Sequence, residues 1–164
     1  MSIGQSVNPS IYPVAVALGS NLGDRRGHLE FAVSRLREFV QHLRISSFID
    51  TAPVDVPDEQ PRYLNGVVVG ETFLSAEDVL ARLLAIERER GRERPSVRAA
   101  RTLDLDLILY GDLVASTAEL EIPHPRFRER AFVLGPLAEI APEMVDPVSG
   151  RTIGELAREP GPFT

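Results

Sequence analysis

The sequence predicts an α+β fold in which strands and helices follow the order β-α-β-β-α-β, with a C-terminal helical extension. Apolar runs of strand length end at glycine or proline, and apolar residues at helical spacing lie between them. The length of 164 residues suits one domain with a core. This order is typical of a ferredoxin-like βαββαβ sandwich, an antiparallel sheet with helices on one face. We expect the other face to be open.

The first strand is predicted from Tyr12 to Leu18, because this apolar run ends at Gly19-Ser20-Asn21. A helix is predicted to begin near Asp24. Residues 44–49 predict a second strand, and the three prolines within residues 51–62 predict a long loop. The apolar residues at helical spacing in this helix are Leu29, Ala32, Val33, Leu36, Val40 and Leu43.

The second β-α-β part of the predicted order begins with a third strand over residues 64–73. Ser75 with Asp78 resembles a capping box, so a second helix is predicted to start there and to end near Gly91. The arginine-rich residues 92–101 predict a second loop, and a strand with two aspartates follows it.

The C-terminal part is less regular. We expect a short strand near residues 113–115, a helical stretch over residues 128–140 that Gly135-Pro136 breaks, and a short helix near residues 152–157. Residues 1–10 are expected to be a loose tail, and residues 11–164 a single domain.

Composition narrows the possible functions. The net charge of −6 argues against general nucleic-acid binding, and no apolar run approaches the ~20 residues that span a membrane. The chain has no cysteine and no recognisable signal peptide, so we expect a cytoplasmic protein. It also has no lysine, so a phosphate clamp must use arginine, histidine and backbone N–H groups.

The strand after the second loop carries the clearest chemical signal. Strand alternation places Asp104 and Asp106 on one face with Ile108 and Tyr110, and the leucines at 103, 105, 107 and 109 on the other. Two carboxylates on one face repel each other, and a divalent cation between them offsets that cost. Oxygen ligands of this kind suit Mg²⁺ together with substrate phosphates. Two solvated acids on an edge strand are the alternative.

Other residues have both a structural and a functional interpretation. Glu87 lies on the apolar stripe of its helix and needs a partner. The arginines before Asp104 suit a triphosphate as a cluster, although each alone is more typical of a solvated surface. The turn at residues 19–23 and His124 are weak anion or ligand signals. Tyr63, Phe127 and Phe132 can stack on a flat ring, but core packing is their default role.

The chain resembles the 6-hydroxymethyl-7,8-dihydropterin pyrophosphokinase family over residues 12–147. The resemblance rests on the block Arg101-Thr102-Leu103-Asp104-Leu105-Asp106 and on Pro123-His124 with Arg130-Ala131-Phe132. The turn at residues 17–24, Tyr63-Leu64-Asn65, and Glu87 with Gly91-Arg92 add support.

The resemblance implies transfer of pyrophosphate from ATP to the hydroxymethyl group of the pterin, with release of AMP, in folate biosynthesis. It implies that Asp104 and Asp106 hold two Mg²⁺ ions and that Arg92 and Arg101 contact the triphosphate, these four forming the catalytic set. The expected partners are ATP and the pterin, without nucleic acid or membrane, and the chain is expected to be a monomer. The implied ATP-binding residues are Glu87, Arg92, Arg101, Leu107, His124 and Arg130, and the implied pterin-binding residues are Thr51, Val54, Tyr63, Asn65 and Phe132.

The chain departs from the family pattern in its second loop. Arg98-Ala99-Ala100 stands where members often have a tryptophan followed by Gly-Pro, and Pro125 stands where an aromatic residue often follows the histidine. A binding module that senses a nucleotide or pterin without turnover is one alternative function. A Mg²⁺-dependent nucleotidyl transferase, which would release pyrophosphate, is another.

Overall fold

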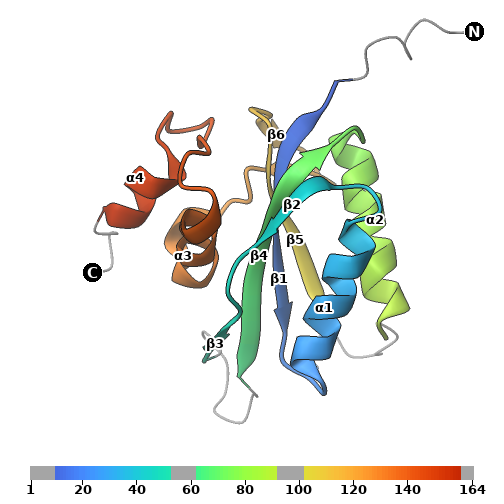
Figure 1. Ribbon diagram of the computed structural model, residues 1–164. Coiled ribbons are helices and arrows are strands. Elements are labelled where there is room, and N and C mark those ends of the chain that lie inside the picture. Colours follow the sequence, from blue (N-terminus) through green and yellow to red (C-terminus); the bar gives the residue numbers. More distant parts are fainter. Residues whose placement is uncertain (1–9, 53–61, 92–101, 160–164) are drawn as a thin grey trace, which may run out of the picture.

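The structure, a computed structural model, describes residues 10–52, 62–91 and 102–159 (Figure 1). The predicted N-terminal tail, apart from Ser10, and most of both predicted loops lie outside these residues. The elements are β1 (Tyr12–Ser20), α1 (Arg25–Leu36), β2 (Gln41–Ile45), β3 (Ile49–Thr51), β4 (Tyr63–Thr72), α2 (Ala76–Glu89), β5 (Asp104–Tyr110), β6 (Ala115–Ser116), β7 (Glu121–Ile122), the 3-10 turn η2 (Phe127–Glu129), α3 (Ala131–Ile140) and α4 (Ile153–Arg158).

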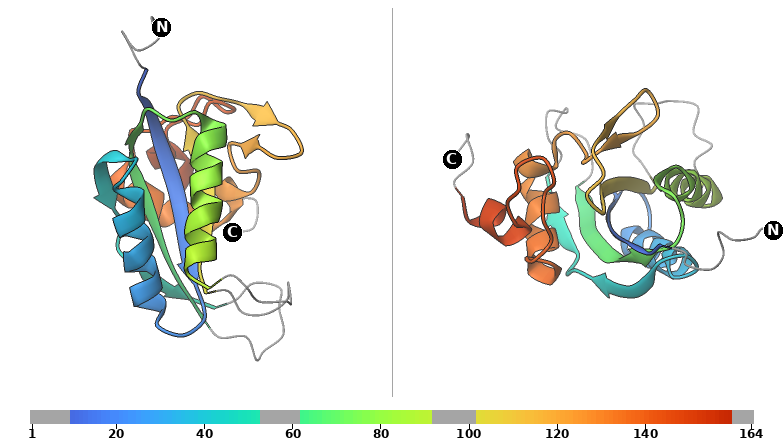
Figure 2. Two further views of the ribbon diagram at one scale, coloured as in Figure 1. Left: turned by 90° about the vertical axis from the view of Figure 1, so that its right-hand side faces the viewer. Right: turned by 90° about the horizontal axis from the view of Figure 1, so that it is seen from above.

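The main sheet is antiparallel, with strand order β2-β4-β1-β5 and with β3 paired to β4. Helices α1 and α2 cover one face, and α3 and α4 lie on the other (Figures 1 and 2). The ferredoxin-like α+β prediction is therefore confirmed. The expectation of an open second face is wrong for the part under α3, where Phe127 and Leu137 are fully buried against the sheet. The highly apolar sequence of α3 explains why it packs there.

The predicted second strand is two strands, β2 and β3, on the same edge of β4. The chain leaves the ladder between them, and Ser46 bridges the gap by accepting from Val67 N at 2.9 Å through its hydroxyl. The Phe48 ring fills the space beside Gly66, where a Cβ would lie 2.7 Å from a ring carbon. Side-chain packing thus interrupts a run that sequence alone presents as continuous.

Helix α1 ends at Leu36, earlier than its apolar spacing predicts. Asp24 caps its start, since its carboxylate accepts from Gly27 N at 3.1 Å. Val40 is buried in the core but lies after the helix, where the chain turns back toward β4. Gly70 permits that close approach, because a Cβ there would stand 2.7 Å from the carbonyl oxygen of Gln41.

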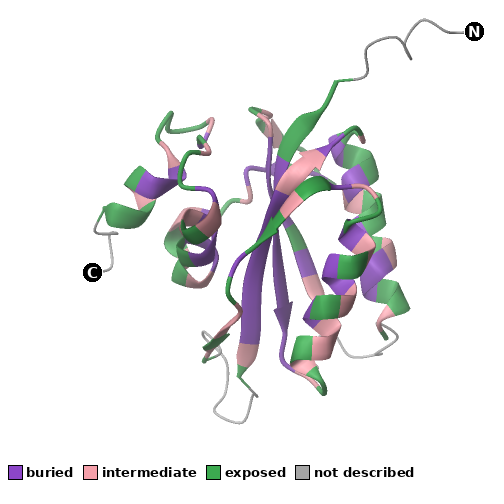
Figure 3. Cartoon of the chain, viewed as in Figure 1, coloured by how far each residue is buried: buried purple, intermediate pink, exposed green. Residues whose placement is uncertain are grey.

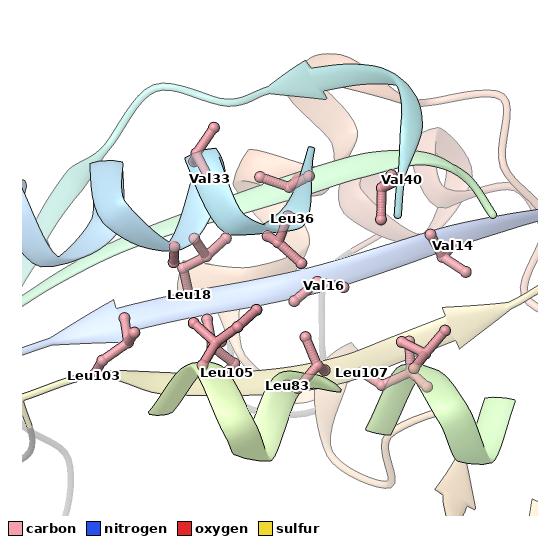
Figure 4. Close-up of a cluster of buried hydrophobic side chains, with 14 of the residues drawn as sticks. Val14, Val16, Leu18, Val33, Leu36, Val40, Leu83, Leu103, Leu105 and Leu107 are labelled. Carbon is pink, nitrogen blue, oxygen red and sulfur yellow. The ribbon is translucent and has the colours of Figure 1, made fainter. Parts of the chain in front are cut away.

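Strand β5 keeps the predicted alternation only in its first half. Leu103, Leu105 and Leu107 face the core beneath α1 and α2 (Figure 4). The pairing with β1 then shifts between Ala15 and Val16, a bulge that adds one residue to β5. After a one-residue shift every side chain changes face. Leu109 therefore packs toward α3, and Tyr110 joins the helix-side core, opposite to the prediction.

The C-terminal extension differs from its prediction in one respect. Helix α3 continues through Gly135-Pro136, which we expected to break it, and Pro136 is buried. Burial of the apolar proline ring offsets the lost backbone hydrogen bond. Helix α4 begins as predicted, with Thr152 and Glu155 forming a capping box.

Two buried clusters hold the layers together. The central parts of β1 and β4 are buried from both sides, while the outer faces of α1 and α2 are largely exposed (Figure 3). Among the described residues, none of the helices combines the length and the apolar character needed to cross a bilayer.

Candidate active site

The candidate site lies at the end of the sheet where β1 carries Gly19. Gly19 pairs with Asn65 of β4 on one side and with Asp104 of β5 on the other. Cross-strand partners project from the same face, and neighbouring strands lie about 4.8 Å apart. The register therefore holds Asn65 and Asp104 on one face, about 10 Å apart, with a residue that has no side chain between them.

Two small residues of β1 form the floor of this space. Ala17 pairs with Asp106 and shares the face of Gly19. A Cβ on Gly19 would stand 3.1 Å from the Asn65 side-chain oxygen and 3.6 Å from the Tyr63 ring. The sequence predicts that Gly19 is part of a turn, whereas in the structure it is a strand residue whose missing side chain leaves room at the site. The small-large alternation of β1 was the available signal, but its meaning depends on the two partner strands.

The two aspartates lie on this face as predicted. Asp104 is partly exposed and Asp106 is exposed, whereas Leu105 between them is buried. Within the described residues, no cluster of three acidic, histidine or cysteine side chains could hold a metal ion. Two carboxylates suffice for Mg²⁺ when substrate phosphates and water complete the octahedron.

Glu87 of α2 finds the partner that its place on the apolar stripe requires. Its carboxylate accepts from Leu105 N at 2.7 Å, and its side chain is only 7% exposed. Because β5 is an edge strand, it has no further strand of the described residues on its outer side to accept a hydrogen bond from this N–H. The Glu87 carboxylate is the acceptor instead. The contact fixes the backbone between the two aspartates.

Replacing Glu87 by leucine leaves the buried Leu105 N–H without this acceptor. We expect the free energy of unfolding to fall by about 1–3 kcal/mol. Glu87→Gln keeps an oxygen acceptor and should lose less. Urea denaturation of both variants measures the difference, and a leucine variant as stable as the glutamine variant would contradict the role of this hydrogen bond.

His124 lies near enough to both Asp106 and Arg130 to interact with their charges. Burial lowers the pKa of His124, the Asp106 carboxylate partly offsets this by raising it, and Arg130 lowers it further. At neutral pH the imidazole is therefore uncharged, with one donor and one acceptor nitrogen. The backbone N–H of His124 donates to Ile108 O at 3.0 Å, so it fastens this segment to the outer edge of β5. Leu107 lies between that contact and the contact made by Glu87.

The predicted pterin residues gather at the other side of Gly19. Asn65 is buried and donates from Nδ2 to Thr51 Oγ1 at 2.6 Å. Tyr63 pairs with Thr51 across β3 and β4. Phe132, near the start of α3, is partly buried against the same sheet face, and the Arg130 guanidinium lies 5.8 Å from its ring centre.

Three predicted residues, Val54, Arg92 and Arg101, lie outside the described residues. The structure does describe where the chain leaves α2 toward residue 92. Arg90 donates from Nε to His28 Nδ1 at 2.8 Å and lies over the Phe31 ring. Gly91 follows with a φ of +94°, the left-handed conformation that glycine tolerates. The contacts of Arg90 hold the C-terminal end of α2 against α1.

Comparison with known proteins gives a consistent result. Residues 15–142 match the model of the family described as 7,8-dihydro-6-hydroxymethylpterin-pyrophosphokinase. The chain is 42% identical over 160 residues to the 2-amino-4-hydroxy-6-hydroxymethyldihydropteridine pyrophosphokinase of Synechocystis, covering 93% of this chain and 81% of that protein. It is 39% identical to the protein of the same name from Pseudomonas aeruginosa, covering 89% of this chain and 90% of that protein.

Longer proteins also match. The chain is 39% identical to a mitochondrial folate synthesis bifunctional protein of Arabidopsis thaliana, of which it spans 28%. A solved Plasmodium falciparum HPPK-DHPS chain superposes with a TM-score of 0.70 over 93% of this chain and 44% of that one, at 16% identity. This structural likeness shows a shared fold.

Proposed function

The chain belongs to the 7,8-dihydro-6-hydroxymethylpterin-pyrophosphokinase family, and we propose that it performs the family's reaction with Mg²⁺ held by Asp104 and Asp106. The enzyme transfers pyrophosphate from ATP to the hydroxymethyl group of 6-hydroxymethyl-7,8-dihydropterin in folate biosynthesis. The observation that carries the site proposal is the strand pairing across β4, β1 and β5, in which Gly19 lies between Asn65 and Asp104.

The reaction moves one group between two substrates. The pterin hydroxyl oxygen attacks the β-phosphorus of ATP, the bond from that phosphorus to the α-phosphate bridging oxygen breaks, and AMP leaves. The hydroxyl proton passes to solvent or to a phosphate oxygen. Little covalent chemistry remains for the protein, so positioning and charge stabilisation are its main tasks.

The donor set at the acidic side suits a hard cation. Asp104 and Asp106 offer carboxylate oxygens from one face, and Glu87 holds the backbone between them. Mg²⁺ at this place would neutralise phosphate charge and make the β-phosphorus more electrophilic. Arg92 and Arg101 are proposed to bind the remaining triphosphate oxygens.

The outer edge of β5 is proposed to hold the nucleoside. Leu107 sits on this edge strand between the contacts made by Glu87 and His124, where its backbone can pair with the polar edge of a purine. His124 and Arg130 would bind the ribose and α-phosphate. Glu87 is also proposed to line this part of the site.

The pterin is proposed to lie over Gly19. Asn65 offers both a donor and an acceptor to the ring's polar edge, and its hydrogen bond to Thr51 fixes its orientation. Tyr63 and Phe132 would hold the faces of the flat ring by stacking. Thr51 and Val54 would add backbone contacts from β3 and the segment after it.

An assay of AMP tests this function. With Mg²⁺ and ATP, AMP should form only when 6-hydroxymethyl-7,8-dihydropterin is present, in a one-to-one ratio with the pterin diphosphate. Pyrophosphate release would instead indicate nucleotidyl transfer. Tight binding of both substrates without AMP would indicate a binding module.

We also propose that the chain acts as a monomer in the cytoplasm. The monomer is supported by the fact that both halves of the proposed site come from one chain. The lack of cysteine suits a reducing compartment. Light scattering of the purified protein gives the mass in solution directly.

A further inference from the structure

Three charged side chains form a closed network at the base of the segment that joins β3 to β4. Asp50 is on β3, Arg62 immediately precedes β4, and Arg25 is the first residue of α1. Arg25 donates to Asp50 Oδ2 at 3.0 Å, and Arg62 donates from Nε to Asp50 Oδ1 at 2.7 Å. We name this set the Asp50 clamp.

Backbone carbonyls complete the Asp50 clamp. Arg25 also donates to Arg62 O at 3.0 Å, and Arg62 donates to Asp50 O at 3.2 Å. Each member therefore contacts both of the others, and three segments far apart in the sequence are joined. Because backbone atoms take part, the clamp constrains where the chain runs as well as where the side chains point.

The Asp50 clamp lies next to the pterin residues but on the opposite face of the sheet. Asp50 and Arg62 directly precede Thr51 and Tyr63, which pair with each other. Asp50 pairs with Leu64, which belongs to the core beneath α1 and α2, so alternation directs it away from Asn65. The clamp lines a recess of about 400 Å³ beside the turn at Asn21, Leu22 and Gly23.

Charge favours the clamp at neutral pH. The hydrogen bond from Arg25, followed by that from Arg62, holds the pKa of Asp50 below its usual value. Asp50 is therefore a carboxylate whenever the enzyme works near neutrality. The three side chains are partly exposed, and isolated ion pairs of this kind contribute little to stability, so the joint contacts of the clamp with two backbone carbonyls matter more than either pair alone.

We propose that the Asp50 clamp positions the pterin-binding half of the active site. It fixes the backbone of Thr51 and Tyr63 from behind, so Asn65 and the Tyr63 ring stand ready before the ring arrives. Preorganisation of this kind lowers the entropy that binding must remove. The inference rests on the proposed pterin site, and it assigns a positioning role to three residues that do not touch the substrate.

The test compares Asp50→Ala with Arg44→Ala. Arg44 is a matched control, because it makes an exposed ion pair with Glu143 and donates to the Ile140 carbonyl, joining β2 to the end of α3. For Asp50→Ala we expect KM for the pterin to rise about three- to tenfold, with kcat and KM for ATP nearly unchanged. Arg44→Ala should change none of the three.

Salt provides a second readout. Raising ionic strength to about 0.5 M should raise the wild-type KM for the pterin toward that of Asp50→Ala, and should affect the variant less. Asp50→Asn, which keeps the shape without the charge, replaces Asp50→Ala if thermal unfolding shows that the alanine variant does not fold.

Two results would overturn the inference: a pterin KM equal to that of Arg44→Ala, or an equal rise of KM for both substrates. Failure of the proposed function is distinguishable, since the wild-type enzyme would then form no AMP with the pterin.

Discussion

Replacing Asp104 or Asp106 by alanine should lower AMP formation by about 10³-fold or more. Each carboxylate is proposed to hold Mg²⁺ against the triphosphate, and no third acidic, histidine or cysteine side chain in the described part of the chain stands ready to replace it. Removing one of two repelling acids should not destabilise the fold. Thermal unfolding and a steady-state AMP assay measure the two effects separately.

Asp112→Ala is the matched control for these variants. Asp112 is an exposed aspartate just beyond the other end of β5, after the Gly111 turn. Its variant should keep nearly full activity. Chelation of Mg²⁺ should abolish wild-type activity, and added Mg²⁺ should restore it. Full activity in both Asp104→Ala and Asp106→Ala would show that the metal assignment is wrong.

Asn65→Leu should lower kcat/KM for the pterin by about 10²-fold. Leucine has a similar volume, but it cannot satisfy the donors and acceptors of the pterin edge. KM for ATP should change little, because Gly19 separates Asn65 from the acidic side. Varying each substrate in turn measures both values.

Thr51→Val is the matched control for Asn65. It removes the hydroxyl that accepts from Asn65 Nδ2 but leaves the amide in place. We expect a smaller loss, about three- to tenfold in kcat/KM for the pterin. Equal losses in the two variants would mean that the amide orders β3 and β4 and does not read the ring.

The sequence predicted the fold well where the signal is local. Ser75 caps its helix as predicted, and the helices predicted to begin near Asp24 and Thr152 are capped by those residues, because a cap needs only its own next turn. The early end of α1 and the split of the second strand could not be predicted, since both depend on glycines of β4 that let other chain segments approach.

The site was predictable in its residue types more than in its arrangement. The shared face of Asp104 and Asp106 follows from strand alternation, and the structure confirms it. The bulge that exchanges the faces of Leu109 and Tyr110 depends on the pairing with β1, and the sequence near these two residues does not indicate it. The partner of Glu87 is a backbone N–H of an edge strand, which only the tertiary structure provides.

Gly19 is another residue whose role could not be predicted from the sequence around it. A glycine after an apolar run is typical of a turn, and nothing nearby in the sequence indicates that two other strands flank it. Its role follows only from the simultaneous pairing with Asn65 and Asp104.

A crystal structure of the enzyme with Mg²⁺, a non-hydrolysable ATP analogue and the pterin is the most direct test of the proposed arrangement of metal, nucleotide and pterin around Gly19. We expect carboxylate oxygens of Asp104 and Asp106 about 2.1 Å from Mg²⁺, and the pterin ring between Tyr63 and Phe132 with its polar edge on Asn65. Metal ions bound to the phosphates without either aspartate, or a ring bound away from Gly19, would contradict it.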